Sequence, residues 1–310
     1  MKKFINKTLA FLMPFVLLLF FLYNLDSVIL KLNFPKNITT LIVGDSHSEC
    51  GIIDSLLLNS KNISQSGETF FFSYQKIKRI WKYHKFDTLI ISYSPHNLTH
   101  LQDNKTLGTD SQKFYKELYP RYLRCLDVES MLFIINKSEV GILSSFSNFI
   151  KSTLKNYFQF NITYLGSYRG SYNSNLSDKD ITDKVRIHFY DEKQVPYKES
   201  NIEPIYLNKI VDFSRENNIQ AILVNLPVHP KYKEQIPMKI ENYYHSSLDL
   251  FVKNNVRIYN FEKICYPDSC YGDGDHLNTY GAKLLTIELI DNLKKENLSF
   301  GMQEFQFLHK

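Results

Sequence analysis

The chain has 310 residues, enough for one large domain or two small ones with a sizeable buried core. Its hydrophobic share of 44% and charged share of 22% are those of an ordinary globular protein. The net charge is +5, but the lysines are scattered along the chain, which argues against a nucleic-acid-binding surface. The glycine-rich phosphate-binding patterns of nucleotide-binding proteins are also absent from the sequence.

The N-terminus carries a candidate membrane anchor. Lysines precede an uncharged run from Thr8 to Asn24, which lies near the lower limit of about 17 apolar residues for a membrane span. No small-residue cleavage site follows it, and the lysines favour a cytoplasmic N-terminus. We therefore expect a cytoplasmic tail (residues 1–7) and a single transmembrane helix (8–30) in the inner, cytoplasmic membrane. The remaining chain would lie on the periplasmic or extracellular side, and a buried core helix is the alternative.

Short apolar runs and amphipathic segments alternate after the anchor. This pattern predicts strands over residues 39–44, 62–64, 87–93, 219–226 and 256–261. It predicts helices over residues 52–58, 68–84, 203–213, 240–252 and 278–293. Strands that alternate with helices indicate an α/β fold, a parallel sheet with helices on both faces. We assign this domain to residues 38–295, followed by a C-terminal tail over 296–310.

The alternation is lost between residues 98 and 201. This region is rich in Ser, Asn, Tyr and Lys, and we interpret it as a long insertion with helices over residues 110–126 and 139–157. Long insertions in compact domains are usually functional. The insertion is therefore expected to form a cap over the substrate cleft, and a structural excursion without substrate contact is the alternative.

The tetrad Gly44-Asp45-Ser46-His47 directly follows the first predicted strand. Active sites on parallel sheets lie beyond the carboxyl ends of the strands, so Ser46 is a candidate nucleophile. A serine hydroxyl needs a base to take its proton before it attacks. The backbone N–H of Ser46 would point toward the same cleft and is a candidate donor to an oxyanion.

Two further strand ends offer oxyanion donors. Gly67 lies at the second strand-to-helix junction, where it could present an unobstructed backbone N–H, although a tight turn alone would also require glycine. The third strand ends in Tyr93-Ser94-Pro95-His96-Asn97, and either His96 or Asn97 could donate a further hydrogen bond. The sequence leaves the choice between these two side chains open.

The segment Asp273-Gly274-Asp275-His276 opens the last predicted helix and supplies a candidate base. A carboxylate can hold the His276 imidazole in the tautomer that leaves one ring nitrogen for Ser46. Asp273 is the expected partner, and Asp275 is an available alternative. The longer series of spaced carboxylates that a calcium loop requires is absent, so we expect neither a metal nor any other cofactor.

Two other features near this segment remain open. His229 follows a buried strand and should face the same cleft, so His229 and Asp275 are candidates for substrate binding. A loop histidine without a role is the alternative for His229. Cys265 and Cys270 could close a small disulfide loop in an exported chain, or they could be unpaired thiols.

The ordered motifs resemble those of the SGNH (GDSL-type) hydrolase superfamily. They are Gly-Asp-Ser, an Asn-x-x-x-x-Gly block from Asn62 to Gly67, a polar strand end and Asp-x-x-His. The resemblance extends from about residue 39 to 293, apart from the insertion, and it implies a flavodoxin-like three-layer α/β/α fold. It implies Ser46 as nucleophile, His276 as base, Asp273 as its orienting carboxylate and Gly67 in the oxyanion hole. The third block departs from the expected Gly-x-Asn-Asp, because His96 stands where the asparagine belongs and Asn97 follows it.

The run Asp275-His276-Leu277-Asn278 followed by Gly281-Ala282 is similar to members that act on bacterial cell-surface glycans. The resemblance therefore implies a carbohydrate O-acyl (acetyl) esterase or O-acyltransferase whose substrate is a glycan or an acylated small molecule. A membrane acyl-donor protein is a candidate partner. The sequence does not choose between water and a sugar hydroxyl as the acceptor. The alternative is an inactive glycan-binding or scaffold protein that keeps the fold.

Overall fold

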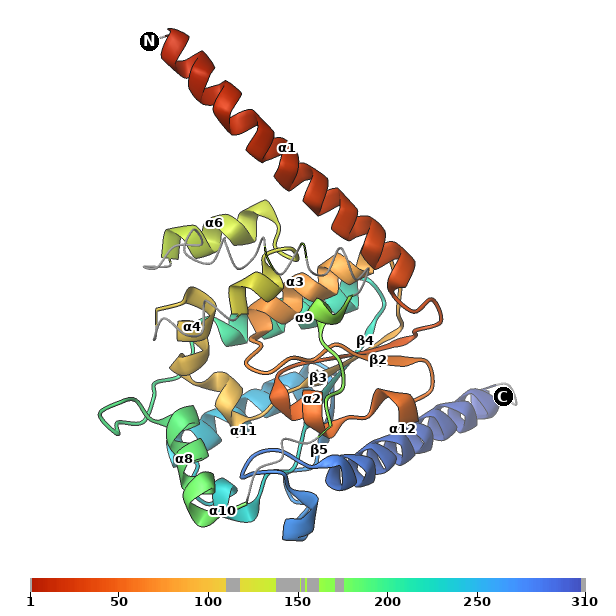
Figure 1. The fold of residues 1–310 in the computed structure, drawn as a ribbon. Coiled ribbons are helices and arrows are strands. Elements are labelled where there is room, and N and C mark those ends of the chain that lie inside the picture. Colours follow the sequence, from red (N-terminus) through yellow and green to blue (C-terminus); the bar gives the residue numbers. More distant parts are fainter. Residues whose placement is uncertain are drawn as a thin grey trace. The chain divides into compact units, whose positions relative to one another are not determined.

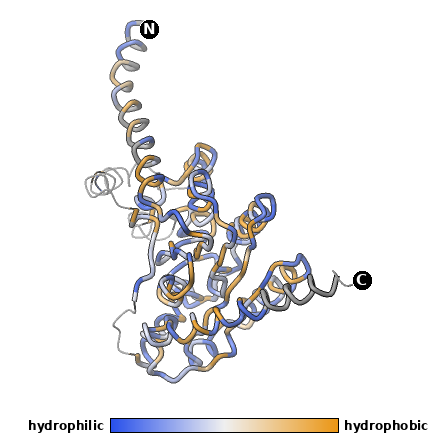
Figure 2. Tube along the Cα trace, turned by 90° about the vertical axis from the view of Figure 1, so that its right-hand side faces the viewer, coloured by the Kyte–Doolittle hydropathy of each residue, from blue (hydrophilic) through white to orange (hydrophobic). Residues whose placement is uncertain are grey.

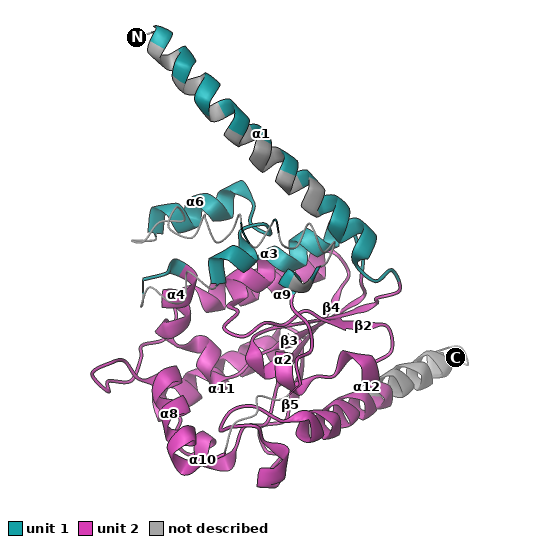
Figure 3. Ribbon diagram, viewed as in Figure 1, with its two compact units in different colours: residues 1–36, 75–85, 107–165 teal, residues 37–74, 86–106, 166–310 magenta. Residues whose placement is uncertain are grey.

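A computed structural model describes residues 2–109, 118–137, 151, 154, 162–170 and 176–307. The chain divides into two compact units (Figure 3). Unit 1 comprises residues 1–36, 75–85 and 107–165, and unit 2 comprises residues 37–74, 86–106 and 166–310. The predicted insertion is split by this division, because residues 98–106 and 166–201 belong to unit 2.

Unit 1 contains α1 (Lys2–Asn33), the second half of α3 (Phe70–Trp81) and α6 (Val128–Lys137). Two side chains tie α1 to residues 75–85: Arg79 donates to the Ser27 hydroxyl at 2.8 Å, and His84 Nε2 lies 3.0 Å from the Leu30 carbonyl oxygen.

Within the described residues, no helix is both long and apolar enough to cross a membrane. The structure therefore does not support the predicted transmembrane helix over residues 8–30.

The centre of unit 2 is a parallel sheet, which in the described part of the chain has five strands in the order β2-β1-β3-β4-β5 (Figure 1). The strands are β1 (Thr40–Val43), β2 (Ser60–Asn62), β3 (Thr88–Ser92), β4 (Gln220–Asn225) and β5 (Arg257–Asn260). This order is that of flavodoxin-like sheets. The predicted α/β fold with a parallel sheet flanked by helices is thereby confirmed.

Both faces of the sheet are buried, which explains why its strands are continuous apolar runs. On one face Ile42, Ile90 and Ile222 pack with Leu285 and Leu289 of α12 (Thr279–Phe307). Neighbouring strand residues point to the opposite face, where Leu41, Leu89 and Leu223 are also fully buried. There α9 (Glu203–Glu216) packs against β4, and α11 (Met238–Lys253) packs against β5. Apolar and polar residues alternate along the described part of α12 (Figure 2).

The remaining helices of unit 2 show where the sequence-based prediction was wrong. The predicted helix over 52–58 is instead a short α2 (Ser46–Gly51) followed by a 3-10 turn (Asp54–Leu56), because Asp45 caps a helix that starts six residues earlier. The other short elements of unit 2 are α4 (His100–Leu107), whose last residue belongs to unit 1, α8 (Asp178–Phe189), α10 (Pro230–Lys233) and the 3-10 turns Pro95–Leu98 and Asp268–Cys270. Unit 1 also contains the 3-10 turn Thr163–Leu165.

The expectations for the insertion are met only in part. Residues 118–122 are helical, as predicted for 110–126, whereas residues 110–117 and almost all of the predicted helix over 139–157 lie outside the described residues. Of the two alternatives for Cys265 and Cys270, a disulfide or unpaired thiols, the structure has the second: Cys265 is exposed, Cys270 is buried, and both are free thiols.

Gly44 makes the turn from β1 into α2, and we predict that Gly44→Ala destabilises the protein by more than about 2 kcal/mol. Its φ is +146°, and an added Cβ would lie 2.6 Å from both Ser92 Cβ and Ser48 Oγ. The free energy of unfolding in urea tests this, with Gly170→Ala as the control, because the nearest atom to that Cβ is Thr279 Oγ1 at 3.4 Å. Equal losses in the two variants would contradict the prediction.

Candidate active site

The site lies at the carboxyl ends of β1 and β3, the neighbouring strands at which the strand order reverses. The chain passes from β1 to β2 on one side, whereas β3 lies on the other side of β1. A crevice that holds the ligand forms outside the strand ends at such a switch point. Ser46 follows β1, and His96 and Asn97 follow β3. Polar residues from both sides of the switch point therefore come together here.

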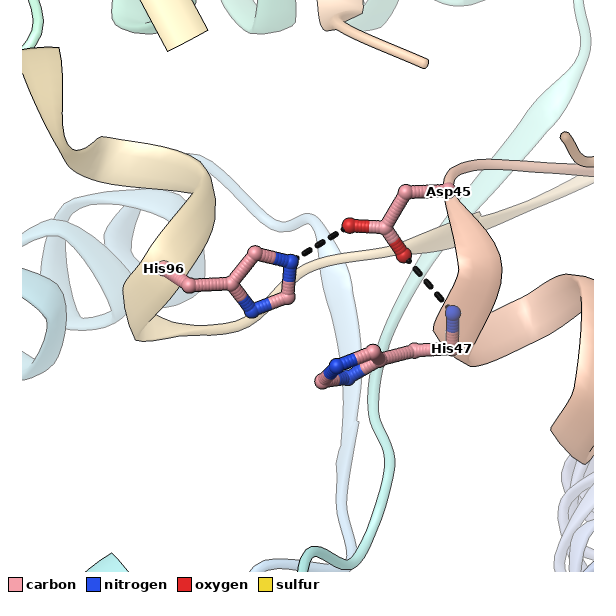
Figure 4. A group of neighbouring side chains, drawn as sticks. All are labelled: Asp45, His47 and His96. Carbon is pink, nitrogen blue, oxygen red and sulfur yellow. Dashed lines mark hydrogen bonds and ion pairs between the residues drawn. The ribbon is translucent and has the colours of Figure 1, made fainter. Parts of the chain in front are cut away.

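Asp45 joins these two strand ends. Its carboxylate accepts from the backbone N–H of His47 at 3.0 Å and thereby caps α2. Its second oxygen faces His96 Nε2 (Figure 4), at a distance of 2.5 Å. The same oxygen accepts from Asn97 Nδ2 at 2.8 Å. Burial raises the pKa of Asp45, but His96, His47 and Asn97 lower it more, so this pKa lies well below its usual range. Asp45 is therefore a buried anion with a partner on each oxygen.

His96 is held as a neutral donor. Burial lowers its pKa, against the opposing effect of Asp45. A neutral imidazole that donates from Nε2 to Asp45 has Nδ1 as an acceptor, and Ser94 Oγ lies 3.1 Å from that nitrogen. Both ring nitrogens of His96 are thus used within the protein. Asn97 also holds Asp45, but its amide carries a second hydrogen beyond the one directed at this carboxylate.

Helix α2 connects Ser46 to the far end of the chain. Ser46 is the first residue of α2, and His47 Nε2 lies 3.3 Å from Asp275 Oδ2 across 228 residues of sequence. The His47 ring is also 5.3 Å from the His276 ring, centroid to centroid. The structure therefore brings the segment that begins with Ser46 beside the segment that carries His276.

His276 meets both candidate carboxylates. Its Nδ1 lies 2.8 and 2.9 Å from the two oxygens of Asp273 and 3.2 Å from Asp275 Oδ1. The backbone N–H groups of Asp275 and His276 also donate to Asp273, at 3.1 and 2.9 Å, which fixes this carboxylate under the ring. A ring held at Nδ1 by a carboxylate presents Nε2 at its opposite edge, the geometry that a triad base requires.

The two carboxylates also change the proton affinity of His276. Burial lowers its pKa, but Asp275 and Asp273 outweigh burial and raise the pKa to about 10. The pKa of Asp275 lies well below its usual range, because His276, His47 and His188 offset the effect of its burial. At neutral pH the pair therefore consists of an imidazolium and a carboxylate, and the base must first lose a proton before it can act.

Gly67 lies in a loop that is fastened to α2. Ser48 Oγ donates to Ser64 Oγ at 2.8 Å, and Ser66 Oγ donates to the Glu49 carboxylate. Gly67 itself has a φ of +75°, a left-handed conformation that favours glycine. This loop places Gly67 near the start of α2, on the side of β1 opposite to His96.

The two candidate substrate-binding residues occupy interior positions. His229 caps α10, its backbone N–H donates to the Gly274 carbonyl at 3.1 Å, and its Nε2 lies 3.2 Å from Asp268 Oδ1. It therefore holds the loop that carries Asp273 and His276. Asp275 is 1% exposed and is surrounded by imidazoles. In this structure both residues support the site from within.

Sequence reasoning missed three residues of the centre. Lys184 Nζ of α8 lies 3.0 Å from Asp273 Oδ2 and 3.6 Å from Asp275 Oδ1. His188, one turn further along α8, lies 2.6 Å from the Tyr232 hydroxyl and stacks on His96 with centroids 5.1 Å apart. Helix α8 comes from the region without a clear alternation, so no pattern indicated that its side chains reach the site. His47 was part of the tetrad, but it had been given no role.

A pocket opens beside the histidines. Its volume is about 380 Å³, which includes the part that is open to solvent. His47 and His96 are among the residues that line it. Apolar and polar side chains line it in similar numbers, and charged groups are among them. Its other lining residues are Ser94, Pro95, Phe189, Asn225, Leu226, Val228, Tyr232, Lys233, Ile236, Glu241 and Glu262.

The donor atoms of two groups lie close enough together to consider a metal ion. Among the described residues these groups are Asp45, His47 and His96, and His47, Asp275 and His276. In both, the donors already engage one another: His96 Nε2 faces Asp45 in the first group, and His47 Nε2 and His276 Nδ1 face Asp275 in the second. Lys184 also supplies a cation to the second group. We therefore assign these residues to a hydrogen-bonded charge network.

No protein-family model matches the sequence, and no curated protein matches it either. The solved structures to which the chain is similar include a Bacteroides fragilis protein provisionally assigned as an acylhydrolase. The two chains are 10% identical, the TM-score is 0.40, and the match covers 86% of this chain and 93% of the other. This likeness is too distant to indicate a function, which must be inferred from the geometry of the site.

The raised pKa of His276 predicts an alkaline rate profile for any reaction in which it acts as a base. Only the neutral imidazole accepts a proton, so the rate of ester cleavage should rise with pH toward about 10. An ordinary histidine would give a plateau above about 6.5. The test is kcat/KM for an aryl acetate between pH 6 and 10.5, after subtracting the rate of Ser46→Ala at each pH. A plateau that begins below pH 7 would contradict the prediction.

Proposed function

We propose that this chain is a serine hydrolase or acyltransferase that cleaves O-acyl esters. Ser46 is the nucleophile, His276 the base, and Asp273 the carboxylate that orients the base. One observation supports this proposal above the others: the contact of His47 with Asp275 brings the start of α2 beside His276, although 228 residues separate the two contacting groups. The order of the motifs, which resembles that of the SGNH hydrolases, agrees with the same assignment.

The chemistry follows from these positions. Neutral His276 takes the proton of the Ser46 hydroxyl through Nε2, and the serine oxygen attacks the ester carbonyl. The same nitrogen then gives the proton to the departing alcohol, which leaves an acyl group on Ser46. Attack by water completes an esterase cycle, whereas attack by a sugar hydroxyl completes a transferase cycle. Asp273 keeps the ring orientation through both steps.

The oxyanion that forms in each step needs donors near Ser46. We assign this role to the backbone N–H groups of Ser46 and Gly67 and to the side chain of Asn97. Asn97 is preferred to His96 because both nitrogens of His96 are engaged by Asp45 and Ser94. Asn97 directs one amide hydrogen to Asp45. Its Nδ2 also lies 3.3 Å from His96 Nε2, but that nitrogen is itself a donor and cannot accept the second hydrogen.

The finer parts of the proposal concern substrate and location. The resemblance of the last motif to proteins that act on cell-surface glycans supports an O-acetylated or O-acylated glycan as substrate. A location on the outer side of the cytoplasmic membrane, with a membrane acyl-donor protein as partner, belongs to the same proposal.

A second candidate function is a non-catalytic glycan-binding protein. It is favoured by the raised pKa of His276, which keeps this base protonated at neutral pH. The two candidates differ in whether Ser46 can be acylated at alkaline pH, where His276 is neutral.

We predict that a fluorophosphonate probe labels the wild-type protein at Ser46 and labels it faster as the pH rises to 10. Ser46→Ala should abolish labelling, and His276→Ala should reduce the labelling rate by at least about 10³-fold, because the serine hydroxyl is then without its base. Labelling followed by mass spectrometry of the modified peptide is the measurement.

His100→Ala serves as the control, because His100 is a histidine at the start of α4 whose side chain is 45% exposed and pairs with Asp103. It should retain labelling within about tenfold. Undiminished labelling of Ser46→Ala, or no labelling of folded wild-type protein at any pH, would contradict the enzymatic proposal and favour the binding role.

A further inference from the structure

The reaction centre has one carboxylate more than a serine triad needs. Asp273 alone can orient His276, yet Asp275 Oδ1 also lies 3.2 Å from the same ring nitrogen. Asp273 and Asp275 are 2% and 1% exposed, so solvent screens little of their charge. Two such carboxylates stabilise the imidazolium, and a base that keeps its proton cannot activate Ser46.

Helix α8 supplies a cation to the same carboxylate oxygens, Asp273 Oδ2 and Asp275 Oδ1, that face His276. Lys184 Nζ lies 3.0 Å from Asp273 Oδ2 and 3.6 Å from Asp275 Oδ1, so one ammonium group bridges both acids. The Lys184 side chain is 28% exposed. Burial lowers its pKa, but Asp275 and Asp273 raise it more, so Lys184 stays charged wherever His276 titrates.

The position of α8 does not depend on this lysine. Ile181, Val185 and Phe189 of α8 pack into a cluster of buried residues with Tyr232 and Ile240. These side chains anchor the helix by its apolar face. Replacing Lys184 with an uncharged side chain of similar length should therefore leave α8 in place.

We propose that Lys184 is a positioning residue of the reaction centre: its ammonium group holds Asp273 and Asp275 and offsets their charge, so that His276 can release its proton. The inference rests on the proposed function, since it assigns a role to the base of that reaction. Lys184 belongs to the region 98–201, so this region would also contribute a residue to the reaction centre.

Other titratable groups also surround His276 and stay unchanged in the test. His47 and Cys50 come from α2, His188 from α8, Tyr232 from α10 and Lys105 from α4, and each interacts electrostatically with Asp273, Asp275 or both. Lys184 differs from these in its direct contact with both carboxylates.

The test compares Lys184→Met with Lys184→Arg and with Lys179→Met, a control on the same helix whose lysine is 88% exposed and pairs with Asp183. In Lys184→Met the alkaline limb of kcat/KM should move up by about one pH unit, which is about a tenfold loss on the rising limb. The deficit should shrink toward the top of the pH range, to about threefold at pH 10.5. Lys184→Arg and Lys179→Met should keep the wild-type profile, because the charge beside the carboxylates is retained.

A uniform loss at every pH in Lys184→Met would overturn the proposal, since it would show a structural role, and so would an unchanged profile.

A second measurement does not require activity: NMR titration of His276 in ¹³C-histidine-labelled protein, assigned with His276→Asn. In the Ser46→Ala background, Lys184→Met should raise the titration midpoint by a similar amount. A raised midpoint in protein without hydrolytic activity would support the role of Lys184 while refuting the proposed function. An unmoved midpoint would refute the role of Lys184 whether or not the protein is an enzyme.

Discussion

The carboxylate of Asp45 is the constraint on which the rest of the site depends. A buried anion is costly unless each of its oxygens finds a partner. Asp45 obtains these partners from α2, which follows it, and from the end of β3, 50 residues later. The same bonds start α2 at Ser46 and fix the polar end of β3. Loss of the Asp45 charge would therefore remove the N-terminal cap of α2 and the hydrogen-bond partner of His96 and Asn97. The rings of His47 and His188, which pack against His96, would then be less well fixed.

Much of the sheet could be predicted from the sequence because its strands are buried on both faces. Continuous apolar runs such as Leu41 to Val43 and Ile222 to Val224 are typical of strands that helices cover on both faces. The start of α2 was missed for a local reason. Ser46 to Gly51 includes two serines, a histidine and a glycine, and it becomes helical through the Asp45 cap and not through an apolar periodicity.

The candidate site was predictable where a residue stands beside a strand end in the chain. Ser46, His96 and Asn97 belong to that group, whereas His276 was predicted from the Asp-x-x-His motif that precedes the last helix. Lys184 and His188 were not predictable in either way, because they reach the site only through the packing of α8 on distant apolar residues. The hydrophobic pattern of a segment does not indicate which distant segment of the chain it will contact. The same reason explains why Asp275, a candidate for substrate contact, is instead buried among imidazoles.

The loop that carries the base is fastened at Gly274, whose carbonyl accepts from His229 and whose α-carbon leaves no room for a side chain against Ile181. Each of these contacts crosses a long stretch of chain, so closing this loop carries a large entropic cost until the sheet and α8 are in place. During synthesis, all five described strands leave the ribosome before residue 273 does. The proposed nucleophile Ser46 is therefore made long before the proposed base His276, and the candidate site would assemble as one of the last steps of folding. A partly folded chain would carry Ser46 in an unreactive state.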